Sequence, residues 1–544
     1  MIFDLSRNHL IIYYSAALLA MATVAFRKRK FHGHNSNLAE FLFLAALGLT
    51  VCVLLGEKIF SSVYQYHNWS RLQKTFAIAY GFRLYYPADA GPAMITLYGP
   101  IAALAYLPAA GSSSPMTAMR LAETLNIFYF FFPAFLILRL PASHAVSERL
   151  HRTMLFLIFC MLSFLSSTLK EAAFNVHADA VTLGFAAMAC YFLQKYDWDL
   201  KKKWLWLSAF FAVSSVWSKQ VAVPVVIALP LYLYFRYGLK TAARYLFCLF
   251  GTGTALLVLF VWMYGIHDMF VNMFYIPGRH PYRDGGGFPV GFKSAVKLAR
   301  ECLLPWVILL ILFIGAGRGN KQSATPEGRW MRRPWFLYFF LGLWMIPVSI
   351  LGNIKVGGSN NTFSYAVYFF TLAAATGFMT TGVLGGSLAG QKLTRAAGLL
   401  AFALCLIGIP MAYYRLWTSG RQHNFALEAY RYAQAHPGKT YFPTLPLIHL
   451  LAEKKLYHDV VALMDRDWAG IKITEEHLRA HLPAQLEVIA FPDVSDKLID
   501  WIPLKEFKLG AEDEELPGFL VYRKYDPERE KRFTGRTWQE AGLA

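Results

Sequence analysis

Carboxylate side chains are scarce in the first 414 residues of the chain, and none lies near the middle of a long apolar run. A carboxylate at the end of such a run can accept a proton from a hydroxyl group, orient another base or bind a cation. Coupled transport usually needs ionisable groups at mid-membrane, so the pattern favours chemistry at the ends of the apolar segments. Six carboxylates lie there: Glu57, Asp89, Glu171, Asp179, Asp268 and Asp284.

Basic side chains in the same connecting segments could bind an anion, because Arg and Lys form charge-assisted hydrogen bonds with phosphate oxygens. The candidates are Arg71, Lys74, Arg83, Lys219, Arg279, Arg283 and Lys355. They alternate with four short polar motifs: residues 81–87 followed by 96–100, the triplet His177-Ala178-Asp179, the triplet Ser218-Lys219-Gln220, and residues 355–361. Each motif also has a structural interpretation: Asp179 can cap a helix, Lys219 can extend to a membrane interface, and Gly357-Gly358 forms a turn in either case.

The composition indicates which kind of protein positions these residues. Of the 544 residues 56% are hydrophobic and only 16% charged, and the mean hydropathy is +0.37. A soluble protein has about 25% charged residues, which excludes a cytosolic enzyme, a disordered chain and a coiled coil. We expect an all-α polytopic membrane protein with about 11–13 transmembrane helices. The apolar runs are 9–26, 40–56, 121–139, 153–170, 178–194, 204–218, 220–235, 245–264, 301–316, 335–352, 364–383 and 396–414.

Positive charge predicts how these spans are oriented. Clusters of Lys and Arg follow alternate spans and contain 21 of the 35 basic residues in positions 1–414, and such loops face the cytoplasm. The net charge of +19 therefore reflects membrane topology, and nucleic acid is not an expected partner. Segment 96–110 is apolar but short and contains Pro100 and Pro108, so we expect a helix on the outer surface. The external segments are then 57–120, 171–177, 265–300, 353–363 and the tail from 415.

Three parts of the chain are expected to have different roles. Residues 1–39 contain an extra N-terminal span and a basic cytoplasmic loop; a signal peptide is the alternative, but the basic cluster 27–30 favours a retained span. Residues 40–414 form the transmembrane domain, and residues 415–544 a small external α/β domain. In the tail, segments 423–436 and 447–456 are helix-like, and segments 439–443, 486–491 and 518–522 are strand-like.

The sequence gives little indication of a metal or redox site. All six cysteines lie in or beside apolar runs without a Cys-x-x-Cys motif, which is typical of core residues. A divalent cation, Mg²⁺ or Mn²⁺, could bind if His177 and Asp179 met His267 and Asp268, but spacing alone does not show whether they meet. No Walker motif, GxGxxG or Ser/His/Asp hydrolase signature is present.

Over residues 40–414 the sequence resembles the membrane-embedded GT-C glycosyltransferases, which include the lipid A aminoarabinose transferase, the RgtA-like sugar transferases and the protein mannosyltransferases. The resemblance rests on four features in the family's order. They are the large first external loop with Tyr98-Gly99-Pro100, Asp179 at the outer start of a span, the Lys219-Gln220 turn, and the Gly-rich, Asn-containing loop 357–361.

The resemblance implies transfer of a hexose or pentose from a polyprenyl-phosphate donor to a lipid, glycan or protein acceptor at the outer face of the membrane. A bacterial inner membrane, with the site and the tail on the periplasmic or extracellular side, is the expected location. Members usually have one or two acidic residues early in the first external loop, but here residues 65–68 read Gln-Tyr-His-Asn. Glu57 and then Asp89 are the candidate bases, His67 is a possible substitute, and Asp179 is expected to orient the base, the acceptor or a metal.

The residues expected to bind substrate are His67, Arg83, Tyr85, Tyr98, His177, Lys219, Gln220, Arg279, Arg283, Lys355 and Asn360. Three other functions remain open. A lipid-linked oligosaccharide polymerase or ligase would rely on Arg and His in its outer loops, and a flippase would need a polar central cavity. A catalytically inactive relative that binds polyprenyl lipid would explain the missing early carboxylate.

Overall fold

The computed structural model describes residues 36–60, 66–140, 146–317, 333–383, 414, 424–492, 496–502, 504–510 and 514–524. Several predictions lie outside the described residues. They are the span 9–26 with its basic cluster, the span 396–414 apart from Tyr414, and most of the basic loop after residue 317.

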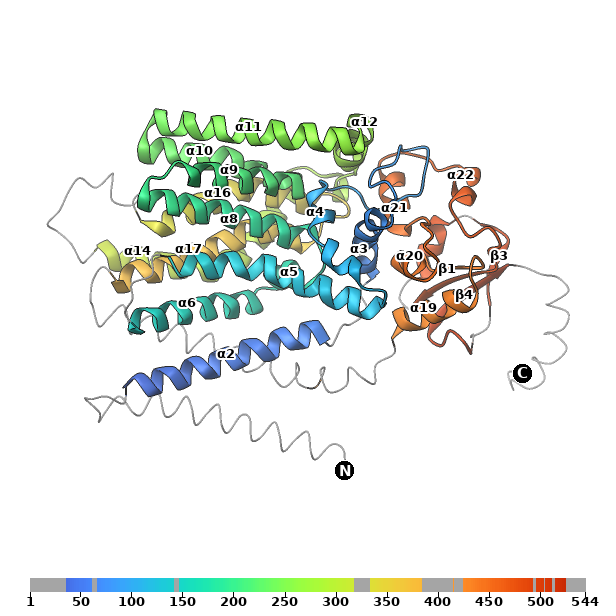
Figure 1. Ribbon diagram of the computed structural model, residues 1–544, viewed down its shortest axis with the longest axis horizontal. Helices are drawn as coiled ribbons and strands as arrows, with labels where there is room; N and C mark the ends of the chain where they lie inside the picture. The colour runs from blue at the N-terminus through green and yellow to red at the C-terminus, as the bar shows by residue number, and fades with distance from the viewer. Residues whose placement is uncertain are drawn as a thin grey trace, which may run out of the picture.

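A bundle of long helices forms the larger part of the protein, and ten of the twelve predicted apolar runs coincide with its helices (Figure 1). Apolar runs of this length form helices in lipid because a helix satisfies all its own backbone hydrogen bonds. The helices are α2 (Ser36–Phe60), α5 (Pro115–Leu138), α6 (Val146–Leu165), α8 (Ala178–Asp199), α9 (Lys203–Ser218), α10 (Val223–Tyr237), α11 (Leu239–Tyr264), α14 (Phe288–Gly317), α16 (Pro334–Ile354) and α17 (Ser364–Val383).

Length and apolar composition make several of these helices able to cross a membrane. In the described residues, four segments meet both requirements by themselves: Pro115–Leu138, Gln220–Tyr237, Leu239–Tyr264 and Pro334–Ile354. A fifth crossing results if Arg152–Leu165 and the short helix α7 (Ser167–Phe174), which bends from it by 102°, count as one broken span. The outer face of α11 exposes large apolar side chains, with Phe250 at 74% and Trp262 at 81%. These side chains suit lipid as their surroundings, and the protein is an integral membrane protein.

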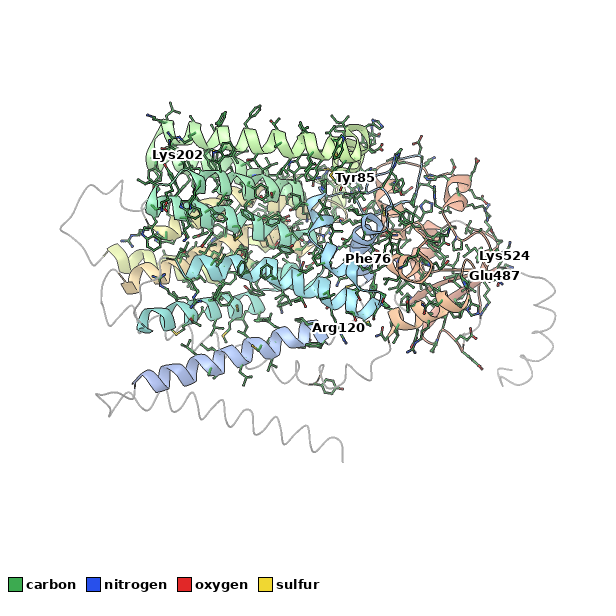
Figure 2. The ribbon with its side chains drawn as sticks, viewed as in Figure 1. Phe76, Tyr85, Arg120, Lys202, Glu487 and Lys524 are labelled. Carbon is green, nitrogen blue, oxygen red and sulfur yellow. The ribbon has the colours of Figure 1, made fainter. Side chains whose placement is uncertain are left out.

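Short helices and loops collect at one end of the bundle, and the tail packs on that end (Figure 1). Lys202, in a basic cluster predicted to be cytoplasmic, lies at the end away from Glu487 and Lys524 of the tail (Figure 2). The external loops and the tail therefore share one end of the bundle, as the charge pattern predicts. The short elements there are α3 (Tyr66–Ala79), α4 (Ile101–Leu104), η2 (Leu107–Gly111), η3 (Gln220–Ala222), α12 (Ile266–Phe270), the π-helix η4 (Val271–Tyr275), α13 (Ile276–Arg279), η5 (Arg283–Gly285) and η6 (Asn360–Phe363).

The tail is a small α/β unit, as its alternating pattern predicts. Its four-stranded sheet has the order β1-β2-β4-β3, with β1 parallel to β2 and the other pairs antiparallel. The two helices and three strands expected from the sequence are present, whereas α21, α22, η7 and β3 were not predicted. The elements are α19 (Phe425–Ala435), β1 (Thr440–Tyr441), α20 (Pro446–Glu453), α21 (Val460–Trp468), α22 (Glu475–Ala480), β2 (Val488–Pro492), η7 (Asp496–Trp501), β3 (Phe507–Leu509) and β4 (Phe519–Lys524).

The first external loop and the tail share a hydrophobic core. Trp69 and Phe76 of α3 belong to the same buried cluster as Phe442 and Leu447 of the tail. Backbone bonds join the two as well: the Asp459 N–H donates to the Ala93 carbonyl at 2.8 Å. Because the loop and the tail both bury apolar surface in this cluster, the tail packs directly against the loop.

The segment 96–110 differs from its prediction. In place of one helix on the membrane surface it forms α4 and η2, and Ala102, Ala103 and Ala109 are buried. Pro100 stands at the start of α4 and Pro108 removes an N–H from the next turn, so a continuous helix cannot form. Both short helices instead pack against α3. The Thr75 hydroxyl of α3 donates to the Ala103 carbonyl of α4 at 2.9 Å.

Candidate active site

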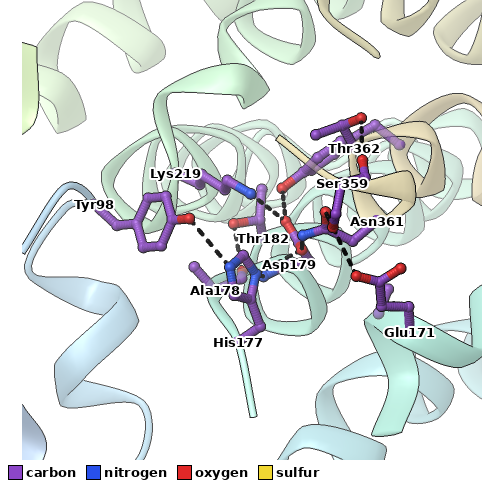
Figure 3. Close-up of polar contacts among 12 residues, drawn as sticks. Tyr98, Glu171, His177, Ala178, Asp179, Thr182, Lys219, Ser359, Asn361 and Thr362 are labelled. Atoms are coloured by element: carbon purple, nitrogen blue, oxygen red, sulfur yellow. Dashed lines mark hydrogen bonds and ion pairs between the residues drawn. The ribbon is translucent and has the colours of Figure 1, made fainter. Parts of the chain in front are cut away.

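The buried Asp179 carboxylate is the centre of a polar cluster at the tail end of the bundle (Figure 3). It lies in the first turn of α8 and is 0% exposed. Its Oδ1 lies 2.6 Å from the Lys219 ammonium and also accepts a bond from the Tyr365 hydroxyl. Its Oδ2 lies 2.5 Å from His177 Nδ1 and 2.5 Å from Asn361 Nδ2. Each of the two carboxylate oxygens therefore has two polar partners.

These four donors come from three segments of the sequence, namely the start of α8, the turn after α9, and residues 361–365. His177 is the N-cap of α8, and Lys219 occupies the extended break between α9 and η3. Asn361 lies in η6 and Tyr365 in the first turn of α17. Burying a charge is costly unless it is paired and hydrogen-bonded, and Asp179 with Lys219 meets that condition.

Tyr98 connects this cluster to the first external loop. Its hydroxyl lies 3.1 Å from His177 Nε2, and the Lys219 ammonium lies 4.9 Å from its ring centroid. His177 Nδ1 lies 2.5 Å from Asp179 Oδ2 and 3.2 Å from the Asp179 backbone nitrogen, so the ring tautomer sets which of Tyr98 and His177 donates in their contact. The next residue, Gly99, packs tightly on the α9 end, because a Cβ at Gly99 would lie 1.8 Å from the Trp217 carbonyl oxygen. The Tyr-Gly-Pro motif thus places Tyr98 beside the Lys219 turn.

Gln220 holds two external loops together behind Tyr98. Its side-chain amide donates to the Leu97 carbonyl at 3.1 Å and to the Met273 carbonyl at 2.9 Å. Tyr85, which is buried, donates its hydroxyl to the Tyr98 carbonyl at 2.7 Å. The sequence motifs around Tyr85, Tyr98 and Lys219 are therefore brought together, as expected from their common outer placement.

Two further cations, Arg71 and Lys74, lie on helix α3 next to this cluster. The Lys74 ammonium lies 5.2 Å from the Tyr98 ring centroid, and its side chain is buried. Within the described part of the chain neither Arg71 nor Lys74 has a hydrogen bond or an ion pair. Uncompensated cations in such a position are suited to an anionic ligand.

The charges around α3 act on each other over short distances. Burial lowers the pKa of Lys74 to about 7, helped by the positive charges of Arg71 and Lys219 and opposed by Asp459 of the tail. Burial also lowers the pKa of Arg71, whereas Tyr98, Asp179 and Glu171 raise it. Burial and Arg71 lower the pKa of His67 to about 3, so this histidine is neutral and a weak base. An anion bound here would gain from both cations and relieve their mutual repulsion.

Comparison with known proteins gives a match at the level of the fold. No family model matches the sequence, and no curated protein does. The aminoarabinose transferase ArnT from Cupriavidus metallidurans, solved bound to undecaprenyl phosphate, superimposes with a TM-score of 0.54 at 12% identity, over 90% of this chain and 98% of that chain. Its apo structure gives a TM-score of 0.54 at 12% identity, over 87% and 97%. The chain has the GT-C fold. An oligosaccharyltransferase from Archaeoglobus fulgidus also matches, with a TM-score of 0.42 at 11% identity, over 82% and 68%.

Within this GT-C fold, the two proposed bases lie apart from the Asp179 cluster. Glu57 is buried near the end of α2 and lies 3.0 Å from the Lys58 ammonium. Asp89 is exposed in the turn at residues 87–91, and Arg83 is exposed nearby. Neither carboxylate is a partner of Asp179, Tyr98 or Lys219 among the described contacts. Their assignment as bases stays a prediction that the geometry does not favour.

Other predicted phosphate ligands are used to bind loops to each other. Lys355 donates to the carbonyl oxygens of Pro277 at 2.8 Å and Gly278 at 3.2 Å, and Arg283 donates to the Gly358 carbonyl. Arg279 is exposed, with its guanidinium 4.5 Å from the Tyr275 ring centroid. Asn360 is exposed, and its neighbour Asn361 is the residue that binds Asp179. These positions make the external loops rigid around the site.

The donor set around Asp179 does not fit a divalent cation. All its oxygen positions face hydrogen-bond donors, one of which is an ammonium group. His267 and Asp268 lie in α12 and are not among its partners. The residues that the structure describes contain no group of three or more potential His, Cys, Asp or Glu ligands. No step in the reaction is therefore assigned to a metal ion.

Proposed function

We propose that the protein is a glycosyltransferase that moves a sugar from a polyprenyl-phosphate donor to a lipid, glycan or protein acceptor at the outer face of a bacterial inner membrane. The observation that supports this most strongly is the pair Arg71 and Lys74 beside the buried Asp179 cluster, two cations that have no hydrogen bond or ion pair with any residue the structure describes. The ArnT structure with the same fold contains undecaprenyl phosphate, which supports a lipid phosphate as the anion.

The chemistry of such a donor fits the position of these cations. Its polyprenyl tail lies in the bilayer, so the phosphate must be held where the bundle meets the water. When the bond between the sugar and the phosphate breaks, negative charge builds up on the phosphate oxygens. Fixed positive groups stabilise this charge most strongly where water is excluded, as at the buried Lys74. Arg71 and Lys74 would hold the phosphate, and the rigid Asp179 cluster would hold Lys219 and Tyr98 beside it.

A transfer assay in lipid nanodiscs tests the proposal. The full chain would be incubated with radiolabelled polyprenyl-phosphate hexoses and pentoses and with lipid, glycan and protein acceptors from a bacterial envelope. We expect label to move to an acceptor with one class of donor. Donor binding without transfer to any acceptor class would instead indicate a lipid-binding protein, and a lack of both binding and transfer would contradict the proposal.

The pH dependence of donor binding provides a second test. The lowered pKa of Lys74 means that its ammonium is charged below about pH 7 and neutral above it. Binding of undecaprenyl phosphate should therefore weaken as the pH rises from 6 to 9, by up to about tenfold per pH unit above 7. Measured Kd values for wild type and Lys74→Arg would show this, because an arginine keeps its charge throughout that range.

The phosphate itself titrates near neutral pH and contributes equally to both proteins. Only the difference between the two pH profiles reports on Lys74. Identical slopes for wild type and Lys74→Arg would show that Lys74 does not bind the phosphate as a titrating cation.

A further inference from the structure

The proposed reaction needs a group that accepts the proton of the acceptor hydroxyl, and the buried cluster does not provide one. Asp179 is 0% exposed, and its oxygens already accept bonds from four donors, including the Lys219 ammonium. Protonating it would leave Lys219 as an unpaired buried charge, which is costly. Asp179 is therefore suited to holding Lys219, Tyr365 and Asn361 in place, and a different carboxylate must act as the base.

Glu171 is a further carboxylate that the fold brings to this site. It lies on α7, which turns by 102° from α6 and so runs across the end of the bundle. Its Oε1 accepts a bond of 2.7 Å from the Ser359 hydroxyl, and Figure 3 shows it beside Ser359 and Asn361. Its Oε2 accepts no hydrogen bond from any residue in the described ranges. Glu171 is half-buried, so this oxygen can be reached from outside.

Glu171 lies close enough to Arg71, one of the two cations proposed to hold the phosphate, for the two charges to interact. Its negative charge is one of the two carboxylates that raise the pKa of Arg71. Ser359, which orients the carboxylate, belongs to the Gly-rich loop and is itself held, because its carbonyl accepts from Thr362 Oγ1 at 2.8 Å and from Asn353 Nδ2 at 3.3 Å. Within the described residues Glu171 thus combines a hydrogen-bond contact with the Gly-rich loop, a carboxylate oxygen without a hydrogen bond, and an electrostatic interaction with Arg71.

We propose that Glu171 is the general base of the transfer, an assignment that rests on the proposed function. In this step Glu171 Oε2 takes the proton of the acceptor hydroxyl, and the acceptor oxygen forms a bond to the anomeric carbon of the sugar. The bond between that carbon and the phosphate oxygen breaks, and its electron pair goes to the phosphate, which Arg71 and Lys74 stabilise. The product side is then a glycosylated acceptor, a polyprenyl phosphate and a protonated Glu171.

Glu301 of α14 provides a matched control, because it contacts the start of the same short helix α7. It is also a half-buried glutamate with serine donors, accepting from Ser166 and Ser167 at 3.0 Å each. These serines stand at the start of α7, whereas Glu171 stands in its second half beside the Gly-rich loop. If substitutions at Glu171 and Glu301 act only by disturbing α7, both should therefore lower the transfer rate.

The test compares Glu171→Gln, Glu301→Gln, Asp89→Asn and wild type in single-turnover transfer and in binding of undecaprenyl phosphate. We expect Glu171→Gln to lower the transfer rate by about 10²–10⁴-fold while the Kd changes by less than about threefold, as for loss of a general base. Glu171→Asp should recover part of the rate, and Glu301→Gln should transfer as wild type does, whereas a loss in Asp89→Asn beside an active Glu171→Gln would assign the base to Asp89.

Two results would overturn the assignment. Transfer by Glu171→Gln within a fewfold of wild type would exclude Glu171 as the base while leaving the glycosyltransferase function in place. Equal losses in Glu171→Gln and Glu301→Gln would show that the effect comes from α7 and not from the carboxylate. Failure of the proposed function itself is distinguishable, because in that case wild type would not transfer with any donor.

Discussion

Asp179→Ala is expected to destabilise the folded protein by about 3–5 kcal/mol, because it leaves the buried Lys219 ammonium without its counter-charge. The substitution also removes the acceptor for Asn361, His177 and Tyr365, which together with Lys219 join three separate segments at this point. Thermal unfolding in detergent, followed by tryptophan fluorescence and by the amount of monodisperse protein, would measure the loss. We expect a large fall in the apparent Tm even without substrate.

A double variant separates the ion pair from general packing damage. Lys219→Met removes the charge and keeps a long apolar side chain. The double variant Asp179→Ala with Lys219→Met should therefore lose less free energy of unfolding than the two single variants lose together. The single Asp179→Asn should lie between wild type and Asp179→Ala, because its amide can still accept one bond. Unchanged unfolding of Asp179→Ala would show that the cluster does not contribute to the stability of the fold.

Arg71→Gln should have the opposite pattern, losing function and keeping stability. A hydrogen bond between charged groups is worth about 1.5–3 kcal/mol, so donor affinity should fall by about 10- to 150-fold. Arg71 has no hydrogen bond or ion pair in the described part of the chain, so its removal takes no protein contact of that kind away. The Kd for undecaprenyl phosphate in nanodiscs and the apparent Tm would be measured on the same preparations.

Arg83→Gln is the matched control for this experiment. Arg83 lies in the same external loop and has the same charge, but its side chain is exposed and has no contact with Tyr98 or Asp179. We expect its donor affinity to stay close to that of wild type. Equal losses for Arg71→Gln and Arg83→Gln would indicate only a general electrostatic attraction, and no loss for Arg71→Gln would place the phosphate elsewhere.

The opposite outcomes expected for Asp179 and Arg71 follow from how each charge is compensated. Asp179 has its partners inside the protein, so its removal should lower the free energy of unfolding. Arg71 is half-buried and has no hydrogen bond or ion pair with a described residue. Its removal should therefore weaken ligand binding and leave the stability of the fold nearly unchanged. A ligand that binds only the folded protein also stabilises it. Undecaprenyl phosphate should therefore raise the apparent Tm of wild type more than that of Arg71→Gln.

The apolar spans and the tail's α/β pattern could be predicted because they depend on local properties of the chain. Membrane crossing requires about 20 apolar residues in a row, and the alternation of charged loops predicts which ends lie together. The motifs at Tyr98, Asp179 and Lys219 could be recognised for a similar reason. Each is a polar residue beside a long apolar segment, where it can have few roles other than capping or function.

Which of the charged groups remain free was decided only by the tertiary structure. In the sequence, Lys355 and Arg283 are as suitable for a phosphate as Arg71 and Lys74. In the described residues, the first two donate to backbone carbonyls, and the other two have no hydrogen bond or ion pair. Asn360 and Asn361 are neighbours in the short helix η6, whose backbone turns their side chains in different directions. Only Asn361 donates to Asp179. Such choices depend on distances between residues 75 to 182 positions apart in the sequence, which no local pattern contains.

The position of the candidate base has the same origin. Glu171 follows an apolar run just as Glu57 does, and the sequence offers only its place beside Lys170 as a signal. The 102° bend after α6 turns Glu171 toward Ser359 and Arg71, while Glu57 continues a straight helix and pairs with Lys58. The sequence by itself determined that this is a membrane protein whose polar motifs lie at the ends of its apolar segments. The bend of one helix and the contacts between distant loops decided which carboxylate faces the site, because the energy of a charge depends on what is packed around it in space.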